Sequence, residues 1–343
     1  MKALIYKGHE KIKLENIPKP EIKKNELLIK IKRVGICGSD FQGYLGNTGR
    51  RNPPMIMGHE LSGIVQLEGN SIKLKKGDKV VIQPKLYCGK CDYCKSGLTN
   101  MCPNSEFLGA LNKNGGMAEY LAINEKNVFK VNEEISYTEA CMVEPLSVAY
   151  RAANVIKNKD LQNAEFLLIV GAGTIGLLLL QVLKLKNAKN IIVSDLSNFR
   201  LKNAKKLGAD FTINPLKVDF LAKVKEITKG KFIDYSFEAV GFSTSASQSL
   251  EVLKKCGTAI WIGNAQKIIE VNMQGIVTSE INIKGSYLYN ENDFLNSLRL
   301  IEKGEINFKP IISLEEKLEN GERVFKQLEN NKDGELIKVI LTN

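Results

Sequence analysis

The feature that most constrains the fold is an uncharged run at residues 166–183 that glycines divide into two parts. The first part (166–170) has the length of a strand, and the second (175–185) has the length of a helix. Between them stands the pattern G-x-G-x-x-G, with its glycines at Gly171, Gly173 and Gly176. A tight turn between an apolar strand and an apolar helix is typical of a nucleotide-binding βαβ unit. The run therefore predicts a buried strand, turn and helix, and no membrane span.

Strand and helix patterns alternate after this turn. The expected strands are 191–194, 211–213, 233–237, 258–262 and 281–286, and the expected helices are 199–207, 218–228 and 244–253. Such alternation is typical of a doubly wound parallel sheet with helices on both faces. The sequence therefore predicts an α/β fold for this part of the chain, and its 343 residues leave room for a second domain.

The first third of the chain has a different pattern. Short apolar runs separated by turns predict a β-rich barrel or sandwich, with strands at 26–32, 61–67, 79–82 and 117–123. A last strand at 336–341, which follows expected helices at 293–302 and 321–328, can return to this domain.

A helical stretch joins the two parts. Ser136 and Glu139 form a capping-box pattern at its start, and Pro145 interrupts it. A residue before proline is pushed away from helical dihedral angles. We therefore expect Glu144 at a break between two helices, with its carboxylate pointing into a cleft.

Four cysteines lie close together in the segment CGKCDYCKSGLTNMC: Cys88, Cys91, Cys94 and Cys102. Four thiolates complete the tetrahedral coordination of zinc and leave no position for a substrate, so this spacing predicts a structural zinc site. The alternative is a set of buried or disulfide-bonded cysteines. The chain has seven cysteines and opens without a signal-peptide pattern, so we expect reduced thiols in a cytoplasmic protein.

The strand that follows the glycine turn ends at Asp195. At this position a carboxylate can accept hydrogen bonds from the adenosine ribose, while the glycines let the backbone approach the pyrophosphate. The same carboxylate would repel a 2′-phosphate, so we expect NAD to be preferred to NADP. The alternative is a plain glycine turn with a surface aspartate.

The charge balance suggests one other class of function. The chain has 49 Lys and Arg residues against 38 Asp and Glu, a formal net charge of +11. Together with the cysteine segment, this charge would suit a zinc-containing nucleic-acid-binding protein. The excess is lysine spread along the whole chain, without a basic tract. We therefore expect a lysine-rich surface and no nucleic-acid partner.

Two further residues are candidate metal ligands. Cys37 lies in GICGSD, where a strand enters a glycine turn, and His59 lies in GHE, just before another strand. Taken alone, a single cysteine and a single histidine are more often structural than ligands. The other histidine, His9, is expected at the surface.

Taken together, these motifs resemble the zinc-dependent medium-chain dehydrogenase/reductase family. The resemblance spans essentially the whole chain and is carried by GICGSD, GHE, the four cysteines, GGMAEY, VEPLSV and GAGTIG. Within the family, the polyol branch of sorbitol and galactitol-phosphate dehydrogenases is most similar. The resemblance implies a GroES-like catalytic domain (1–147 and 287–343), a Rossmann NAD-binding domain (148–286), and a homodimer or homotetramer.

The resemblance further implies a second, catalytic zinc. Its ligands would be Cys37 and His59, completed by Glu60 or Glu144 and by a water or substrate oxygen. Alcohol dehydrogenases of the family have a cysteine where this chain has Glu144. Cys141 lies three residues earlier, and we expect it to be a buried structural thiol.

Substrate and cofactor contacts are implied in the same way. Ser39 would hydrogen-bond the substrate hydroxyl, and Tyr289 would line the substrate site. Many relatives pass the alcohol proton through a histidine where this chain has Gln42, which does not titrate near neutral pH. The proton must therefore leave by Ser39, the ribose, water or a carboxylate such as Glu144. The implied cofactor contacts are Gly171, Gly173, Ile175, Gly176, Asp195, Arg200 and Gly263.

The resemblance leaves the substrate open. Sorbitol dehydrogenases have an arginine where this chain has Leu288. Arg50 and Arg51 could instead bind a substrate phosphate at the mouth of the cleft, or they are ordinary solvated loop residues. We expect a zinc-dependent NAD oxidoreductase that interconverts a polyol or polyol phosphate and its ketose. The alternative is a vicinal diol or amino-alcohol dehydrogenase of the butanediol or threonine type.

Overall fold

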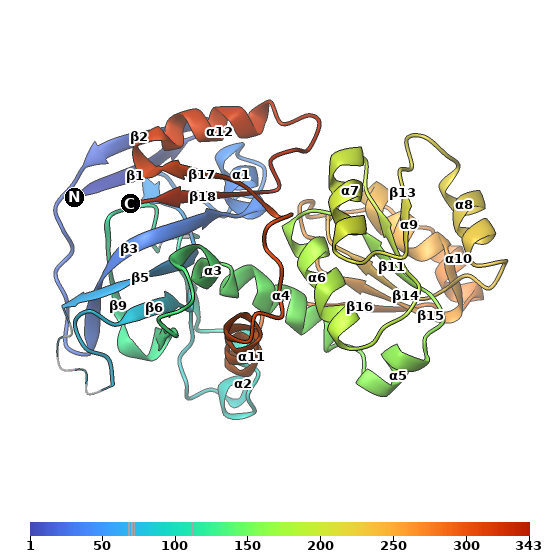
Figure 1. Cartoon of the computed structure of the whole chain (residues 1–343), viewed down its shortest axis with the longest axis horizontal. Coiled ribbons are helices and arrows are strands. Elements are labelled where there is room, and N and C mark those ends of the chain that lie inside the picture. The colour runs from blue at the N-terminus through green and yellow to red at the C-terminus, as the bar shows by residue number, and fades with distance from the viewer. Residues whose placement is uncertain (68, 70, 72, 112) are drawn as a thin grey trace.

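The computed structural model describes residues 1–67, 69, 71, 73–111 and 113–343, which form two lobes side by side (Figure 1). The α/β lobe is built on a six-stranded sheet in the order β13-β12-β11-β14-β15-β16, and all neighbouring strands are parallel. Its strands are β11 Leu167–Val170, β12 Ile191–Ser194, β13 Phe211–Ile213, β14 Ile233–Glu238, β15 Leu253–Trp261 and β16 Asn282–Gly285. This is the strand order of a Rossmann fold, so the predicted doubly wound sheet is confirmed.

Helices cover both faces of this sheet. Alternate residues of β11 belong to separate cores, with Leu167 and Ile169 in one and Leu168 and Val170 in the other. Successive side chains of a strand point to opposite faces, so an apolar run without alternation is buried on both sides. The helices of this lobe are α5 Asn158–Asn163, α6 Thr174–Leu185, α7 Asn198–Lys206, α8 Phe220–Ile227, α9 Ser243–Glu251 and α10 Met273–Thr278.

The glycine turn joins β11 to α6. Gly171 has a φ of +100°, and a Cβ on Gly176 would lie 1.8 Å from the Gly171 carbonyl oxygen. Side chains at these two positions would therefore clash or strain the turn. The uncharged run forms the predicted strand, turn and helix. In the described part of the chain, no helix has the length and apolar content of a membrane span.

The β-rich lobe contains a seven-stranded sheet and a three-stranded sheet. The larger sheet has the order β10-β6-β5-β3-β18-β17, with β9 also paired to β3, and the smaller has the order β2-β1-β4. The strands are β1 Lys2–Gly8, β2 Lys11–Asn16, β3 Glu26–Ile36, β4 Met55–Ile56, β5 Glu60–Leu67, β6 Lys79–Ile82, β9 Tyr120–Asn124, β10 Val128–Lys130, β17 Ile312–Lys317 and β18 Lys338–Thr342.

The last strand returns to this lobe as predicted. β18 runs antiparallel to β3, with Val339 opposite Ile36. Other expectations were incomplete or wrong in detail. The hairpin of β1 and β2 and the strand β17 were not predicted, and β9 begins at Tyr120 rather than at residue 117.

Four helices connect and flank the lobes: α3 Tyr137–Cys141, α4 Val143–Ala153, α11 Glu291–Glu302 and α12 Gly321–Glu329. The capping box of Ser136 and Glu139 is present. The helix break lies at Met142, so the prediction that Glu144 sits at the break was wrong. Glu144 lies in the first turn of α4, where Pro145 is tolerated because the first N–H groups of a helix have no intrahelical acceptor.

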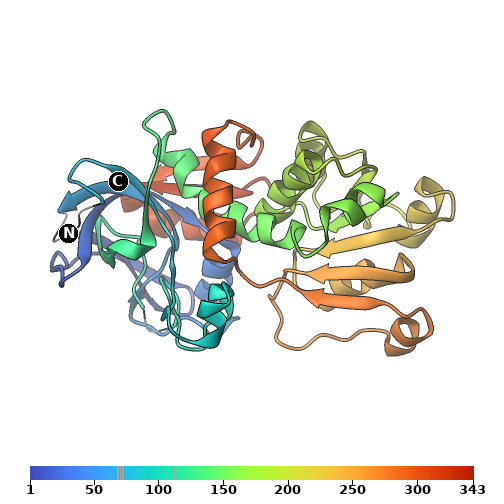
Figure 2. The same ribbon diagram turned by 90° about the horizontal axis from the view of Figure 1, so that it is seen from below.

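Helix α11 stands between the two lobes and packs against α4 (Figure 2). The predicted domain boundary between residues 147 and 148 falls within α4, so this helix belongs to both sides of the division. The boundary itself stays a prediction.

Candidate functional site

The four clustered cysteines meet in a lobe of residues 85–107, here called the cysteine lobe. Its base is the strand pair β7 (Lys85–Leu86) and β8 (Glu106–Phe107). Two short helices, α2 (Asp92–Lys95) and η1 (Thr99–Met101), carry the segments between the cysteines.

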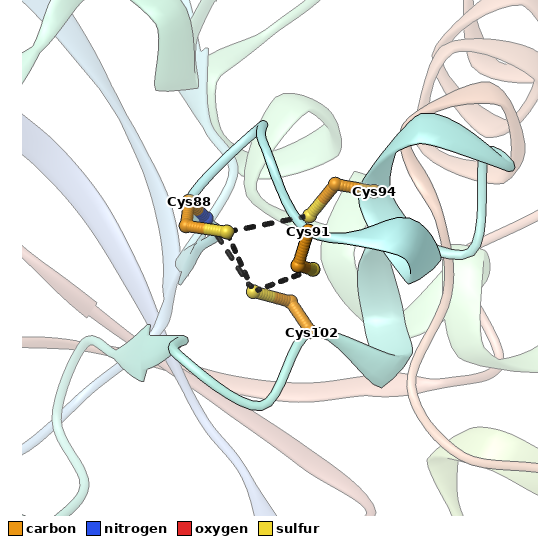
Figure 3. Close-up of side chains that lie close together, drawn as sticks. All are labelled: Cys88, Cys91, Cys94 and Cys102. Atoms are coloured by element: carbon orange, nitrogen blue, oxygen red, sulfur yellow. Dashed lines mark hydrogen bonds between the residues drawn. The ribbon is translucent and has the colours of Figure 1, made fainter.

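The four sulfurs point toward one another (Figure 3). The Sγ–Sγ distances are 4.0 Å for Cys88–Cys94, 3.9 Å for Cys91–Cys102 and 3.6 Å for Cys88–Cys102. Zinc–sulfur bonds of about 2.3 Å in a tetrahedron would place the sulfurs about 3.8 Å apart, so this set fits zinc. Backbone N–H groups of Lys90 and Cys91 lower the pKa of Cys88 to about 6, which favours the thiolate that zinc binds. All seven cysteines are free thiols, so the disulfide alternative is not realised.

The second predicted metal site lies where β3 meets α1 (Gly38–Tyr44). Cys37 is the N-cap of α1, and His59 directly precedes β5. One ligand atom from each of Cys37, His59 and Glu60 lies within 4.8 Å of the others. A cysteine, a histidine and a carboxylate leave one tetrahedral position free for a substrate, which is typical of catalytic zinc.

Asp40 faces the histidine of this site. Its Oδ1 lies 3.4 Å from His59 Nδ1 and 2.9 Å from Arg51 Nη2, and its Oδ2 accepts the backbone N–H of Cys37 at 3.2 Å. Burial opposes ionisation, but His59 and Arg51 outweigh it and hold the pKa of Asp40 well below its usual range. The contact at Nδ1 leaves Nε2 of His59 for a metal.

The pairing of Arg51 changes the interpretation of the two arginines. Arg51 is buried, with its guanidinium on Asp40 and 3.4 Å from Ser39 Oγ. It is therefore not a solvated loop residue, and its charge is already engaged. Gly43 makes room for it, because a Cβ there would lie 2.5 Å from Arg51 Cγ. Arg50, by contrast, is exposed.

A buried lysine holds the Glu60 carboxylate. Lys338 Nζ lies 2.7 Å from both oxygens of Glu60 and donates to the Ile36 carbonyl at 3.0 Å. Both side chains are 1% exposed. Gly35 permits this approach, because a Cβ there would lie 1.9 Å from Glu60 Oε2. A buried carboxylate without such a partner would be strongly destabilising.

Glu144 is buried and lies beside Tyr289. Burial raises the pKa of Glu144 to about 7, and the nearby His59 opposes this shift. The Tyr289 hydroxyl interacts with Glu144 but completes no hydrogen bond within the described residues. Glu144 is not part of the group formed by Cys37, His59 and Glu60. Which carboxylate completes the zinc site stays a prediction.

The remaining predicted residues lie as follows. Ser39 is exposed beside Cys37, Gln42 accepts a hydrogen bond from Asn47, and Cys141 is buried. Asp195 lies against the glycine turn and accepts the backbone N–H groups of Ala172 and Ser197 at 2.7 and 2.8 Å. Arg200 Nε donates to the Gly334 carbonyl, on the segment that leads into β18. Ile175 is the second residue of α6. Gly263 lies two residues after the end of β15, close to Gly241.

Sequence reasoning assigned no role to Asp40 or Lys338. Asp40 had a local signal, because it stands three residues after Cys37, the spacing of a capping box. Lys338 is a single charge at the start of the apolar run KVILT, a pattern that indicates a buried partner without identifying it.

Comparisons with known proteins match both lobes. The family model described as Alcohol dehydrogenase GroES-like domain matches residues 23–133, and that described as Zinc-binding dehydrogenase matches residues 174–303. Sorbitol dehydrogenase from Bacillus subtilis (strain 168) is 34% identical over 324 residues, covering 93% of this chain and 91% of that protein. D-arabitol-phosphate dehydrogenase from Enterococcus avium is 33% identical over 338 residues, covering 97% and 94%.

Solved structures agree with this result. Galactitol-1-phosphate dehydrogenase from Escherichia coli superimposes with a TM-score of 0.91 at 25% identity, covering 100% of both chains. A protein from E. coli CFT073 described as a short chain alcohol dehydrogenase, complexed with NADH, has a TM-score of 0.91 at 28% identity, covering 100% of this chain and 99% of that one.

Proposed function

This chain belongs to the zinc-dependent medium-chain dehydrogenase/reductase family, and from that premise we propose that it interconverts a polyol or polyol phosphate and the corresponding ketose. The observation that carries the proposal is the group of Cys37, His59 and Glu60, with Glu144 and Tyr289 beside it. Relatives with sorbitol and arabitol phosphate in their names support this class of substrate.

The residues of this site would act on the carbinol group. Zinc supplies a Lewis acid that eases loss of the hydroxyl proton, and NAD supplies the hydride acceptor. Ser39 is exposed beside Cys37, so its hydroxyl can accept a hydrogen bond from the substrate and pass the proton to solvent. Asp40, which is itself paired with Arg51, would favour the ring orientation of His59 that presents Nε2 to the metal.

Asp195 is expected to determine the choice of cofactor. Its carboxylate stands at the glycine turn, where it would accept ribose hydrogen bonds and repel a 2′-phosphate. The wild-type enzyme should favour NAD over NADP in kcat/KM by at least about tenfold, and Asp195→Gly should narrow this preference. Initial rates at 340 nm with both cofactors test this, and equal kcat/KM values in the wild-type enzyme would contradict it.

A substrate panel tests the proposed function itself. It contains polyols, polyol phosphates, vicinal diols and threonine, each with NAD. If a phosphate is recognised, a hexitol or pentitol phosphate should have a higher kcat/KM than its unphosphorylated form. Arg50→Ala should then lower this kcat/KM ratio by about 10- to 150-fold. Arg51→Ala should instead lower kcat/KM for every substrate, because Arg51 pairs with Asp40 behind His59. Preference for a diol or threonine would exclude the polyol assignment.

Compartment and assembly belong to the same proposal. Seven free thiols are consistent with the reducing cytoplasm. The strand β16 lies at the edge of its sheet with all four residues exposed, and exposed Met273, Val277 and Ile283 lie on or near this edge. An exposed edge with apolar neighbours favours pairing with a second copy, so we expect a homodimer as the smallest assembly, which leaves a homotetramer open.

A further inference from the structure

The cysteine lobe contacts the segment that carries Tyr289. Asn100, which lies in η1 between Cys94 and Cys102, donates from Nδ2 to the Tyr287 carbonyl at 2.9 Å. Asn100 is only 2% exposed, whereas Tyr287 is 43% exposed, so this bond is partly buried. Figures 1 and 2 both place α2 of the lobe beside α11, the helix that the segment enters at Glu291.

A second contact holds the other end of the segment. The hydroxyl of Tyr87, the residue before Cys88, donates a hydrogen bond to the Glu291 carboxylate at the start of α11. Lys85 Nζ also lies 5.8 Å from the centre of the Tyr287 ring. The cysteine lobe therefore holds residues 287–291 at both ends.

The backbone between these two contacts is strained. Leu288 has a φ of +48°, a left-handed conformation that a branched side chain rarely adopts. Such a conformation persists only where the surroundings hold it. The next residue, Tyr289, is 1% exposed, and its ring packs on Phe294 while its hydroxyl lies near Glu144 without a completed hydrogen bond in the described part of the chain. Small shifts of this segment would move the hydroxyl away from the candidate zinc site.

We propose that the cysteine lobe is a positioning element for substrate binding: it fixes residues 287–291 so that Tyr289 faces Glu144. On this view the structural metal stabilises the substrate side of the catalytic site in addition to its own lobe. The effect on substrate affinity rests on the proposed function, in which Tyr289 contacts the substrate. The effect on the position of residues 287–291 is independent of the proposed function.

The test removes one hydroxyl group from the zinc-loaded enzyme. Tyr87→Phe deletes the bond to Glu291 and keeps the ring. Tyr93→Phe is the matched control, because Tyr93 lies in the same lobe and is half exposed. We expect Tyr87→Phe to raise the substrate KM about fivefold, while kcat and the Kd for NAD stay within about twofold. Hydrogen exchange of the amides at 287–290 should become about fivefold faster.

A second pair of variants distinguishes hydrogen bonding from charge. Glu291→Gln retains an acceptor oxygen for the Tyr87 hydroxyl and should keep the wild-type KM and exchange rates, whereas Glu291→Ala should behave like Tyr87→Phe. The proposal is overturned if Tyr87→Phe and Tyr93→Phe give the same KM and exchange rates, or if kcat falls while KM is unchanged. If no polyol is oxidised, the proposed function fails, and the exchange rates still test the positioning of the segment.

Discussion

Replacing His59 by alanine should lower kcat/KM by at least about 1,000-fold and reduce the zinc content from two ions per chain to one. The reason is geometric, since His59 forms one ligand group with Cys37 and Glu60, while the cysteine lobe holds a separate set of four cysteine sulfurs. Cys37→Ser should have the same effect on both measurements. Metal analysis by mass spectrometry and initial rates at 340 nm provide the readouts.

The second histidine offers a matched control. The side chain of His9 is 68% exposed, so His9→Ala should retain both zinc ions and full turnover. A chelator should also remove the metal of His59 before that of the cysteine lobe, because three protein ligands hold it instead of four. If the wild-type protein contains only one zinc ion per chain, and His59→Ala retains that ion, the catalytic zinc site would be excluded.

Among the substitutions proposed for this protein, Lys338→Met should cause the largest decrease in the free energy of unfolding. The substitution leaves the buried Glu60 carboxylate without its cation, which costs about 3–5 kcal/mol in the free energy of unfolding. Guanidinium unfolding, performed after the catalytic zinc has been removed, measures this loss. Lys338→Arg, which keeps the positive charge, should cost less.

The double variant Glu60→Gln/Lys338→Met completes this experiment. It removes both charges, so it should recover part of the stability that Lys338→Met loses. Repeating the measurement with zinc bound shows whether Glu60 is a ligand. If it is, zinc should stabilise Lys338→Met more than wild type, and equal stabilisation would favour Glu144. If Lys338→Met leaves the free energy of unfolding of the zinc-depleted protein unchanged, this result would contradict a stabilising ion pair between Lys338 and Glu60.

Features encoded by residues close in the sequence could be predicted. The glycine turn, the strands around it and the four cysteines each depend on spacing within a short segment, and the structure places them as expected. The helix break near Glu144 was misplaced: Pro145 lies in the first turn of α4, where it removes no intrahelical hydrogen bond, so the helix tolerates it despite the restriction that proline places on the residue before it.

Pairings between distant residues could not be predicted in the same way. Lys338 and Glu60 are 278 residues apart, and Tyr87 and Glu291 are 204 apart. Each is an ordinary polar residue in the sequence, and only the sheet topology brings it to its partner. Arg51 is close to Asp40 in the sequence, but the space that Gly43 leaves for its side chain is a property of packing.

The position of β18 has a consequence for how the chain assembles during synthesis. The parallel sheet needs only residues 167–285, so it can form as soon as that stretch has left the ribosome. The β-rich lobe must wait much longer, because β3 pairs with a strand that begins at Lys338. Until then Glu60 has no cation beside it, and a long loop must close before the pairing can form. A nascent chain stopped before residue 338 should therefore carry a folded nucleotide-binding lobe and an incomplete metal-binding one.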